Sequence, residues 1–264
     1  DDIKKIKKDI KFDYIFITTK INESIKKIYY KIEKYIDKST AIIPPCTSIP
    51  FWWYKSLKKE KQKIFEKKLD KIFMKNIKRK NIIGMTMWLS GKVEKPGVAR
   101  IGHIQRGLPI KEVFSKFKIK ANSLRKDIKK KCKSPLIKDI YSEIFIKSIN
   151  ALAFNLIALD TKKNNLELSK DFIAKRRIIK ILHEGDNILS KNKIKIFQSA
   201  TSRIKQTLSS KLHTMSMLNS YNNKKPIELV ALWKSFDNLI HNLKMRMPFT
   251  KKIFLSVKKK ISKN

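Results

Sequence analysis

The chain has 264 residues, of which 42% are hydrophobic, so it can bury a core in one or two domains. Its formal net charge of +41 is its dominant property, because such a chain repels itself unless a polyanion neutralises it. Two cysteines exclude a disulfide framework and indicate a reducing compartment, and no apolar run approaches the roughly 18 residues of a membrane span.

The basic residues are almost all lysine, with 55 lysines against eight arginines. Lysine neutralises phosphate as a point charge, whereas reading of base edges favours arginine. The composition therefore favours charge-driven binding to a structured RNA over recognition of a DNA sequence. An AT-rich genome also enriches Lys, Ile and Asn, so mutational bias stays open as a source of part of the lysine content.

The first 54 residues predict a strand, a helix and a loop, in that order. Residues 12–18 alternate as in a short strand, and Ile21–Ile36 repeats isoleucine at helical spacing, with Asn22 as a candidate N-cap. Three prolines in residues 39–50 predict a loop. Four consecutive aromatics follow at 51–54; they suit a core or protein contact better than stacking on exposed bases.

The stretch from Lys67 to Gly107 combines a basic helix with a glycine-punctuated β region. Apolar residues up to Ile77 recur with a period of 3.6, and lysines occupy the opposite side. Five of the six glycines fall between 84 and 107, which predicts tight turns between short strands. Alternation from Met85 predicts a strand that buries Met85, Met87 and Leu89 on one face.

The second half is expected to be mostly helical. Lys111–Ala121 alternates and predicts a return strand, followed by a basic linker over residues 122–133. Apolar spacing from Leu229 to Met247 predicts an amphipathic helix that begins near Pro226. The basic tail, residues 250–264, is expected to become ordered only against a partner.

Together these features predict an α+β fold: a small mixed or antiparallel sheet with a basic helix packed on it, and a mostly helical C-terminal extension. The expected domains are 1–50, an N-terminal helix and loop; 51–146, the α+β domain; and 147–264, the helical basic extension.

Catalytic and cofactor motifs are not recognisable in the sequence. The four histidines are scattered without metal-ligand spacing, and His183–Glu184 suits a surface helix end. Residues 97–102 lack the Gly-Lys-Ser/Thr of a phosphate loop, and the acidic residues are dispersed. We therefore expect a binding protein with no enzyme activity, no cofactor and no metal.

Residues 67–110 resemble the C-terminal domain of the universal small-subunit ribosomal protein S-three family. That family has a helix with two basic residues and a third three positions on, then a glycine, a strand, and Ser-Gly-Arg-Leu followed by Ile-Ala-Arg. This chain has Lys67, Lys68 and Lys71, then Gly84, then Ser90-Gly-Lys-Val93 and Val98-Ala-Arg100 without a gap. The KH domain that precedes this region in the family is not recognisable, apart from a similarity of residues 21–25 to its last helix.

The resemblance implies a divergent mitochondrial structural protein on the head of the small ribosomal subunit, beside the mRNA entry channel. Its implied partners are small-subunit rRNA, mRNA, neighbouring ribosomal proteins and a separate chain carrying the missing KH domain, with no membrane. The implied RNA-binding residues are Lys67, Lys68, Lys71, Lys75, Lys92, Arg100 and Arg106.

Three other classes stay open at this point. A viral nucleoprotein-like protein that coats RNA would need two helical lobes around a basic cleft. An enzyme acting on RNA would need a cluster of carboxylates or histidines, and a peripheral membrane protein would need only the charge.

Overall fold

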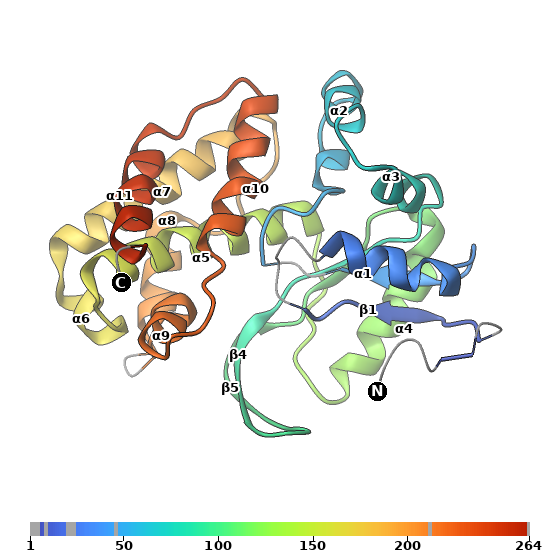
Figure 1. Ribbon diagram of the computed structural model, residues 1–264, viewed down its shortest axis with the longest axis horizontal. Coiled ribbons are helices and arrows are strands. Elements are labelled where there is room, and N and C mark those ends of the chain that lie inside the picture. Colours follow the sequence, from blue (N-terminus) through green and yellow to red (C-terminus); the bar gives the residue numbers. More distant parts are fainter. Residues whose placement is uncertain (1–5, 8–9, 20–24, 45–46, 211–212, 263–264) are drawn as a thin grey trace. The chain divides into compact units, whose positions relative to one another are not determined.

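The computed structural model describes residues 6–7, 10–19, 25–44, 47–210 and 213–262, which form two compact units (Figure 1). The first unit comprises residues 1–144 and the second residues 145–264. Among the described residues, the first unit contains the strands, helices α1 to α4 and the start of α5, and the second is built from helices. The prediction of an α+β fold with a helical C-terminal part is confirmed.

The first unit is built on a β–α–β arrangement. Strands β1 (Tyr14–Phe16) and β2 (Ala41–Ile43) are parallel and are connected through helix α1 (Ile25–Ile32) and a 3-10 turn, Glu33–Tyr35. The expected strand and helix are therefore present, and the proposed cap Asn22 lies outside the described residues. The expected loop at 39–50 contains β2, because Ala41-Ile-Ile43 is fully buried and pairs with β1.

The parallel arrangement continues from β2 to β3 (Ile83–Met85) through a parallel bridge between Ile42 and Ile82. Strand β6 (Ile110–Glu112) then pairs antiparallel with β3. The strand segments therefore follow one another in space as β1, β2, β3 and β6.

Helices cover both faces of these strands. Ile42 points to a core that contains Tyr29 of α1 and Phe73 of α3 (Lys71–Lys78). Its neighbour Ile43 points to a second core on the opposite face, because successive side chains of a strand alternate. That second core includes Leu124 of α4 (Lys118–Lys129), so α1 and α3 lie on one face and α4 on the other.

The aromatic cluster at 51–54 belongs to the protein core. Trp52 and Trp53 are fully buried, and Trp53 donates a hydrogen bond from Nε1 to the Tyr141 carbonyl at 2.8 Å. A 3-10 turn, Trp53–Ser56, and helix α2 (Lys59–Glu66) follow. Stacking of these rings on bases is therefore excluded as their role in this structure.

Strands β4 (Trp88–Lys95) and β5 (Val98–Gly107) form the long hairpin seen in Figure 1. Its turn places Gly97 at a φ of +78°, where glycine is favoured, as the sequence predicted. The predicted burial pattern is wrong, however: Trp88 is buried and Met87 is 46% exposed. The strand is interrupted between Met85 and Trp88, and this break reverses the face that later residues present.

Two further expectations for the first unit are wrong. The basic helix predicted through residues 65–77 is two helices, α2 and α3, because Asp70 caps a new helix by accepting a hydrogen bond from the Ile72 amide. The strand predicted at Lys111–Ala121 and the linker predicted at 122–133 are largely replaced by α4 and the 3-10 turn before it, Ser115–Phe117. Phe117, Ala121 and Leu124 are buried at helical spacing, whereas Ile119 is 84% exposed.

The second unit is a helical assembly, as expected. Helix α5 begins in the first unit and enters the second. Among the described residues, α5 is the one helix long and apolar enough to cross a membrane, contrary to the sequence expectation, but 78% of its apolar window is buried inside the protein. Such burial is typical of a core helix. The helices are α5 (Ile140–Thr161), α6 (Asn165–Lys170), α7 (Phe172–Lys191), α8 (Ala200–Leu208), α9 (Ser216–Asn222), α10 (Leu229–Asn242) and α11 (Pro248–Ile261).

For the last two helices, one sequence prediction is confirmed and the other is wrong. Helix α10 buries the predicted apolar face, including Leu232, Phe236 and Leu239. The tail, expected to need a partner, forms α11 within the chain. Glu184 accepts hydrogen bonds from the Phe249 and Thr250 amides at 2.9 Å, which satisfies the start of α11. Glu184 lies in the middle of α7, so the expected surface helix end is also wrong.

Gly185 allows α7 to approach α5 closely. A Cβ atom at this position would lie 2.4 Å from Cγ1 of Ile149, which is too close for the helices to stay in place. We expect Gly185→Ala to lower the free energy of unfolding by about 1–3 kcal/mol through overpacking, despite the better helix propensity of alanine. Urea denaturation measures the loss, and Ile149→Ala in the same chain should recover part of it. A stabilised G185A variant would contradict the close approach.

Candidate active site

Helix α5 carries polar side chains inside an otherwise apolar core. Ser148, Asn150 and Asn155 are at most 6% exposed, and Lys147 is partly buried. Buried polar groups cost stability unless they are hydrogen-bonded, so their presence in a core helix points to a purpose beyond packing. Sequence reasoning missed them, although polar residues inside the apolar run 144–159 were a visible signal.

Among these four residues, Lys147 carries the ionisable side chain. Burial lowers the pKa of its ammonium from 10.5 to about 8, because desolvation disfavours the charged form. A group with a pKa near neutral pH is well suited to give and take a proton. Lys147 is therefore the candidate general acid and base of the second unit.

Asn150 lies beside a buried ion pair. Arg203 of α8 is fully buried and forms a salt bridge through Nη2 with Asp186 of α7. Its Nη1 also donates a long hydrogen bond of 3.5 Å to Oδ1 of Asn150. Burial raises the pKa of Asp186 and outweighs the opposing effect of the Arg203 charge. These contacts hold α5, α7 and α8 together around the polar residues.

Asn155 connects α5 to the start of α9. Its Oδ1 accepts a hydrogen bond of 2.9 Å from the Met217 amide, and its Nδ2 donates to the Ala151 carbonyl at 2.8 Å. The Met217 amide belongs to the first turn of α9, where helical amides lack partners within the helix. Asn155 therefore fixes the position of α9 about two helical turns beyond Lys147 on α5.

The predicted RNA-binding residues are dispersed over three regions of the first unit. Lys71 and Lys75 lie on α3, whereas Lys67 and Lys68 lie between α2 and α3. Lys92 pairs with Arg100 across the hairpin strands, and Arg100 forms a salt bridge with Glu94. Arg106 forms a salt bridge with Glu143, whose carboxyl group is 3% exposed. The structure therefore does not bring these residues into one site.

The comparisons with known proteins identify a fold that the sequence analysis did not predict. No protein-family model and no curated protein matches the chain. Solved structures do match, and a D-mandelate dehydrogenase with NADH and anilino(oxo)acetate superposes with a TM-score of 0.77 at 17% identity, covering 99% of this chain and 79% of that chain.

Reductases match in the same way. A ketopantoate reductase from Ralstonia solanacearum MolK2 gives a TM-score of 0.77 at 16% identity, over 93% of this chain and 75% of that chain. A 2-dehydropantoate 2-reductase from Geobacter metallireducens GS-15 gives 0.73 at 12% identity, over 94% and 77%.

These matches overturn the ribosomal assignment. The expected structural role on the small subunit, the RNA-coating alternative, and the rRNA, mRNA and ribosomal-protein partners are wrong, as is the expectation that the chain is not an enzyme. The motifs at 90–93 and 98–100 belong to a β-hairpin with a glycine turn, and short motifs of that kind recur in unrelated proteins. The mitochondrial location stays a prediction. The chain has the fold of ketopantoate reductases and D-mandelate dehydrogenase.

Proposed function

We propose that this chain is an oxidoreductase of the ketopantoate reductase and mandelate dehydrogenase type, which reduces the keto group of a 2-oxo acid. The likeness of fold over 99% of the chain carries the proposal. Ketopantoate and anilino(oxo)acetate, named with the matched proteins, are 2-oxo acids, and mandelate is a 2-hydroxy acid, the reduced form of such a compound. The positive charge of the chain suits a carboxylate substrate, because it raises the local concentration of anions.

Lys147 supplies the protein group that such a reaction needs. Reduction of a keto group to an alcohol adds a proton to the oxygen, and the Lys147 ammonium, with its pKa of about 8, can donate one near neutral pH. We assign it the role of general acid in reduction and general base in the reverse reaction. Asn150 and Asn155 position α5 through their contacts with Arg203 and Met217.

The β1–α1 connection does not fit the usual way of holding a dinucleotide. In doubly wound folds the pyrophosphate rests on a glycine-rich turn between a strand and the next helix. Residues 17–24, which connect β1 to α1, read Ile-Thr-Thr-Lys-Ile-Asn-Glu-Ser and contain no glycine. A dinucleotide, when bound to a reductase, supplies the hydride; we assign no residue of this connection to it.

An assay of the purified protein tests the proposal. The oxidation of NADH and of NADPH is followed in the presence of a panel of 2-oxo acids, with ketones that lack the carboxylate as controls. We expect oxidation with at least one 2-oxo acid and none with the matched ketones. Failure of both nucleotides with every 2-oxo acid would contradict the proposal.

A further inference from the structure

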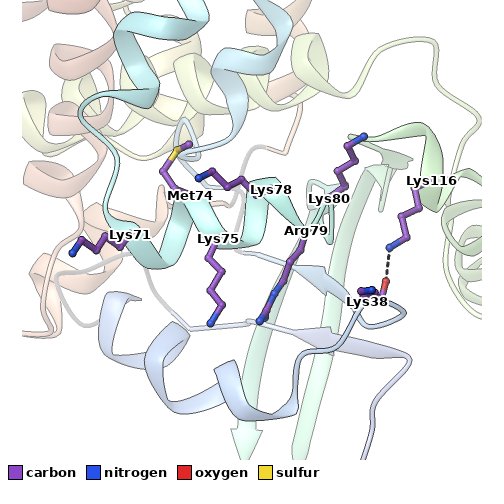
Figure 2. A pocket seen from close by; sticks show the side chains of 8 residues that line it. All are labelled: Lys38, Lys71, Met74, Lys75, Lys78, Arg79, Lys80 and Lys116. Carbon is purple, nitrogen blue, oxygen red and sulfur yellow. Dashed lines mark hydrogen bonds between the residues drawn. The ribbon is translucent and has the colours of Figure 1, made fainter.

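The first unit contains an open cationic cavity, and none of its lining residues belongs to α5. Its volume is about 630 Å³, which is within the range of about 300–1,000 Å³ typical of small-molecule sites. Apart from Met74, every residue that lines it carries a positive charge (Figure 2). The lining residues are Lys38, Lys71, Met74, Lys75, Lys78, Arg79, Lys80 and Lys116.

The cavity lies at one defined edge of the strands. Lys38 precedes β2 and Lys80 precedes β3, and these two strands run parallel. Lys116 follows β6, which runs antiparallel to β3 and therefore ends at the edge where β2 and β3 begin. Ligands of open parallel sheets usually bind at the opposite edge, beyond the carboxyl ends of the strands. The cavity is thus distinct from the place where such a fold holds a dinucleotide.

Two of the cations are held in place by backbone carbonyls. Lys116 donates from Nζ to the Lys38 carbonyl at 2.6 Å, and Arg79 donates from Nη1 to the Ile36 carbonyl at 3.4 Å. Lys75 and Arg79 extend in the same direction from adjacent turns of α3 (Figure 2). Positive groups that are already positioned lose less conformational entropy when an anion binds.

Among the described residues, Lys75 is the one cation lining the cavity that forms a salt bridge. Glu33 forms a salt bridge with Lys75, at a place where both side chains are partly exposed. The Asp37 carboxylate accepts hydrogen bonds from the Ser39 and Thr40 amides at 2.7 and 2.8 Å, so it is engaged in its own turn. Mutual repulsion among the lining cations is relieved when a multivalent anion enters the cavity.

We propose that this cavity binds a small oligophosphate, a free polyphosphate or the phosphate chain of a nucleotide, through Lys75, Arg79, Lys38 and Lys116. Arginine offers planar paired donors to phosphate oxygens, and the lysines act as point charges around them. The site does not depend on the proposed reductase activity, because none of its residues is among those assigned to that activity.

Titration calorimetry with inorganic triphosphate tests the site. The triple variant Lys75→Gln, Arg79→Gln, Lys116→Gln is compared with Lys251→Gln, Lys252→Gln, Lys259→Gln, which removes the same charge from exposed positions on α11. We expect one saturable site per chain, weakened at least about tenfold in the first variant and changed less than about twofold in the second. Adenosine triphosphate is titrated in parallel. Tighter binding than that of triphosphate identifies a nucleotide as the ligand, and equal binding identifies a free polyphosphate.

Equal weakening in both triple variants, or binding of many anions without saturation, would overturn the site in favour of diffuse charge. The single variant K116Q, at an exposed position, repeats the test if the triple variant unfolds, and unchanged affinity there would also count against the site. NADH-dependent reduction, measured on the same samples, should be equal in both triple variants, so failure of the cavity and failure of the proposed function are separate results.

Discussion

Replacing Lys147 by methionine should lower the rate of 2-oxo acid reduction by about 10²–10⁴-fold, the usual contribution of a general acid. Methionine has a similar length and fills the same space on α5, but it carries no proton. Steady-state kinetics on the purified variant measure the loss. The matched control is Lys234→Met on α10, where the side chain is exposed and no loss is expected.

The pH profile separates a chemical role of Lys147 from a structural one. The protonated form donates during reduction, so kcat/KM for reduction should fall as the pH rises through about 8. Oxidation of the hydroxy acid needs the neutral form and should rise over the same range. The K147M variant should lose both pH dependences. A profile that keeps its shape in K147M would remove Lys147 from the reaction.

The K147M variant should be more stable than the wild type, although it should be less active. The pKa of Lys147 is about 8 in the folded chain, below its ordinary value of 10.5, so the folded state favours the neutral amine. Burying the ammonium therefore destabilises the wild type below about pH 8, and this cost fades as the pH rises toward 10.5. K147M should gain up to about 3 kcal/mol near neutral pH and less at high pH, as measured by urea denaturation.

Replacing Arg203 by methionine should destabilise the second unit by about 3–5 kcal/mol, because it leaves the Asp186 charge buried without its partner. Arg203 is fully buried, and the Asp186 side chain is 16% exposed. In the variant, Arg203 no longer opposes the effect of burial, so the pKa of Asp186 rises further and the folded state favours the protonated acid more strongly. Stability should then recover as the pH falls, and urea denaturation at several pH values measures this.

Two further variants test whether the loss of stability in R203M comes from the unpaired charge of Asp186. The double variant R203M/D186L removes both charges and should recover most of the lost stability, since an apolar pair can replace a buried ion pair. Arg177→Met breaks the corresponding pair with Asp160, which keeps Lys260 as a partner, and should cost about 1 kcal/mol or less. Equal losses in R177M and R203M would show that the lack of a second salt-bridge partner at Asp186 is not the cause.

Local patterns in the sequence predicted those elements whose burial follows a single period. The helix α10 and the glycine turn of the hairpin are examples, because apolar spacing in one and backbone freedom at Gly97 in the other are local properties. Prediction failed where the same residues fit both the two-residue period of a strand and the 3.6-residue period of a helix. Residues 113–121 alternate like a strand, but the core of the first unit buries Phe117 and Ala121 on one side of a helix.

The net positive charge of the chain led to the wrong prediction of an RNA partner. Composition identifies an affinity for anions but not which anion, and a +41 chain suits RNA, an oligophosphate and a carboxylate alike. Lys147 was one of 55 lysines, and its altered pKa comes from desolvation in the folded chain. Such an environment is absent from any single stretch of sequence.

The sequence alone determined an α+β chain with a helical second half, a glycine-cornered hairpin and a strong attraction for anions, because these depend on local spacing and summed charge. The tertiary structure decided which charges matter. It partly buried Lys147, fully buried Arg203 in the second unit, and gathered Lys38, Arg79 and Lys116 around one cavity in the first, because desolvation and proximity arise only when distant segments pack together.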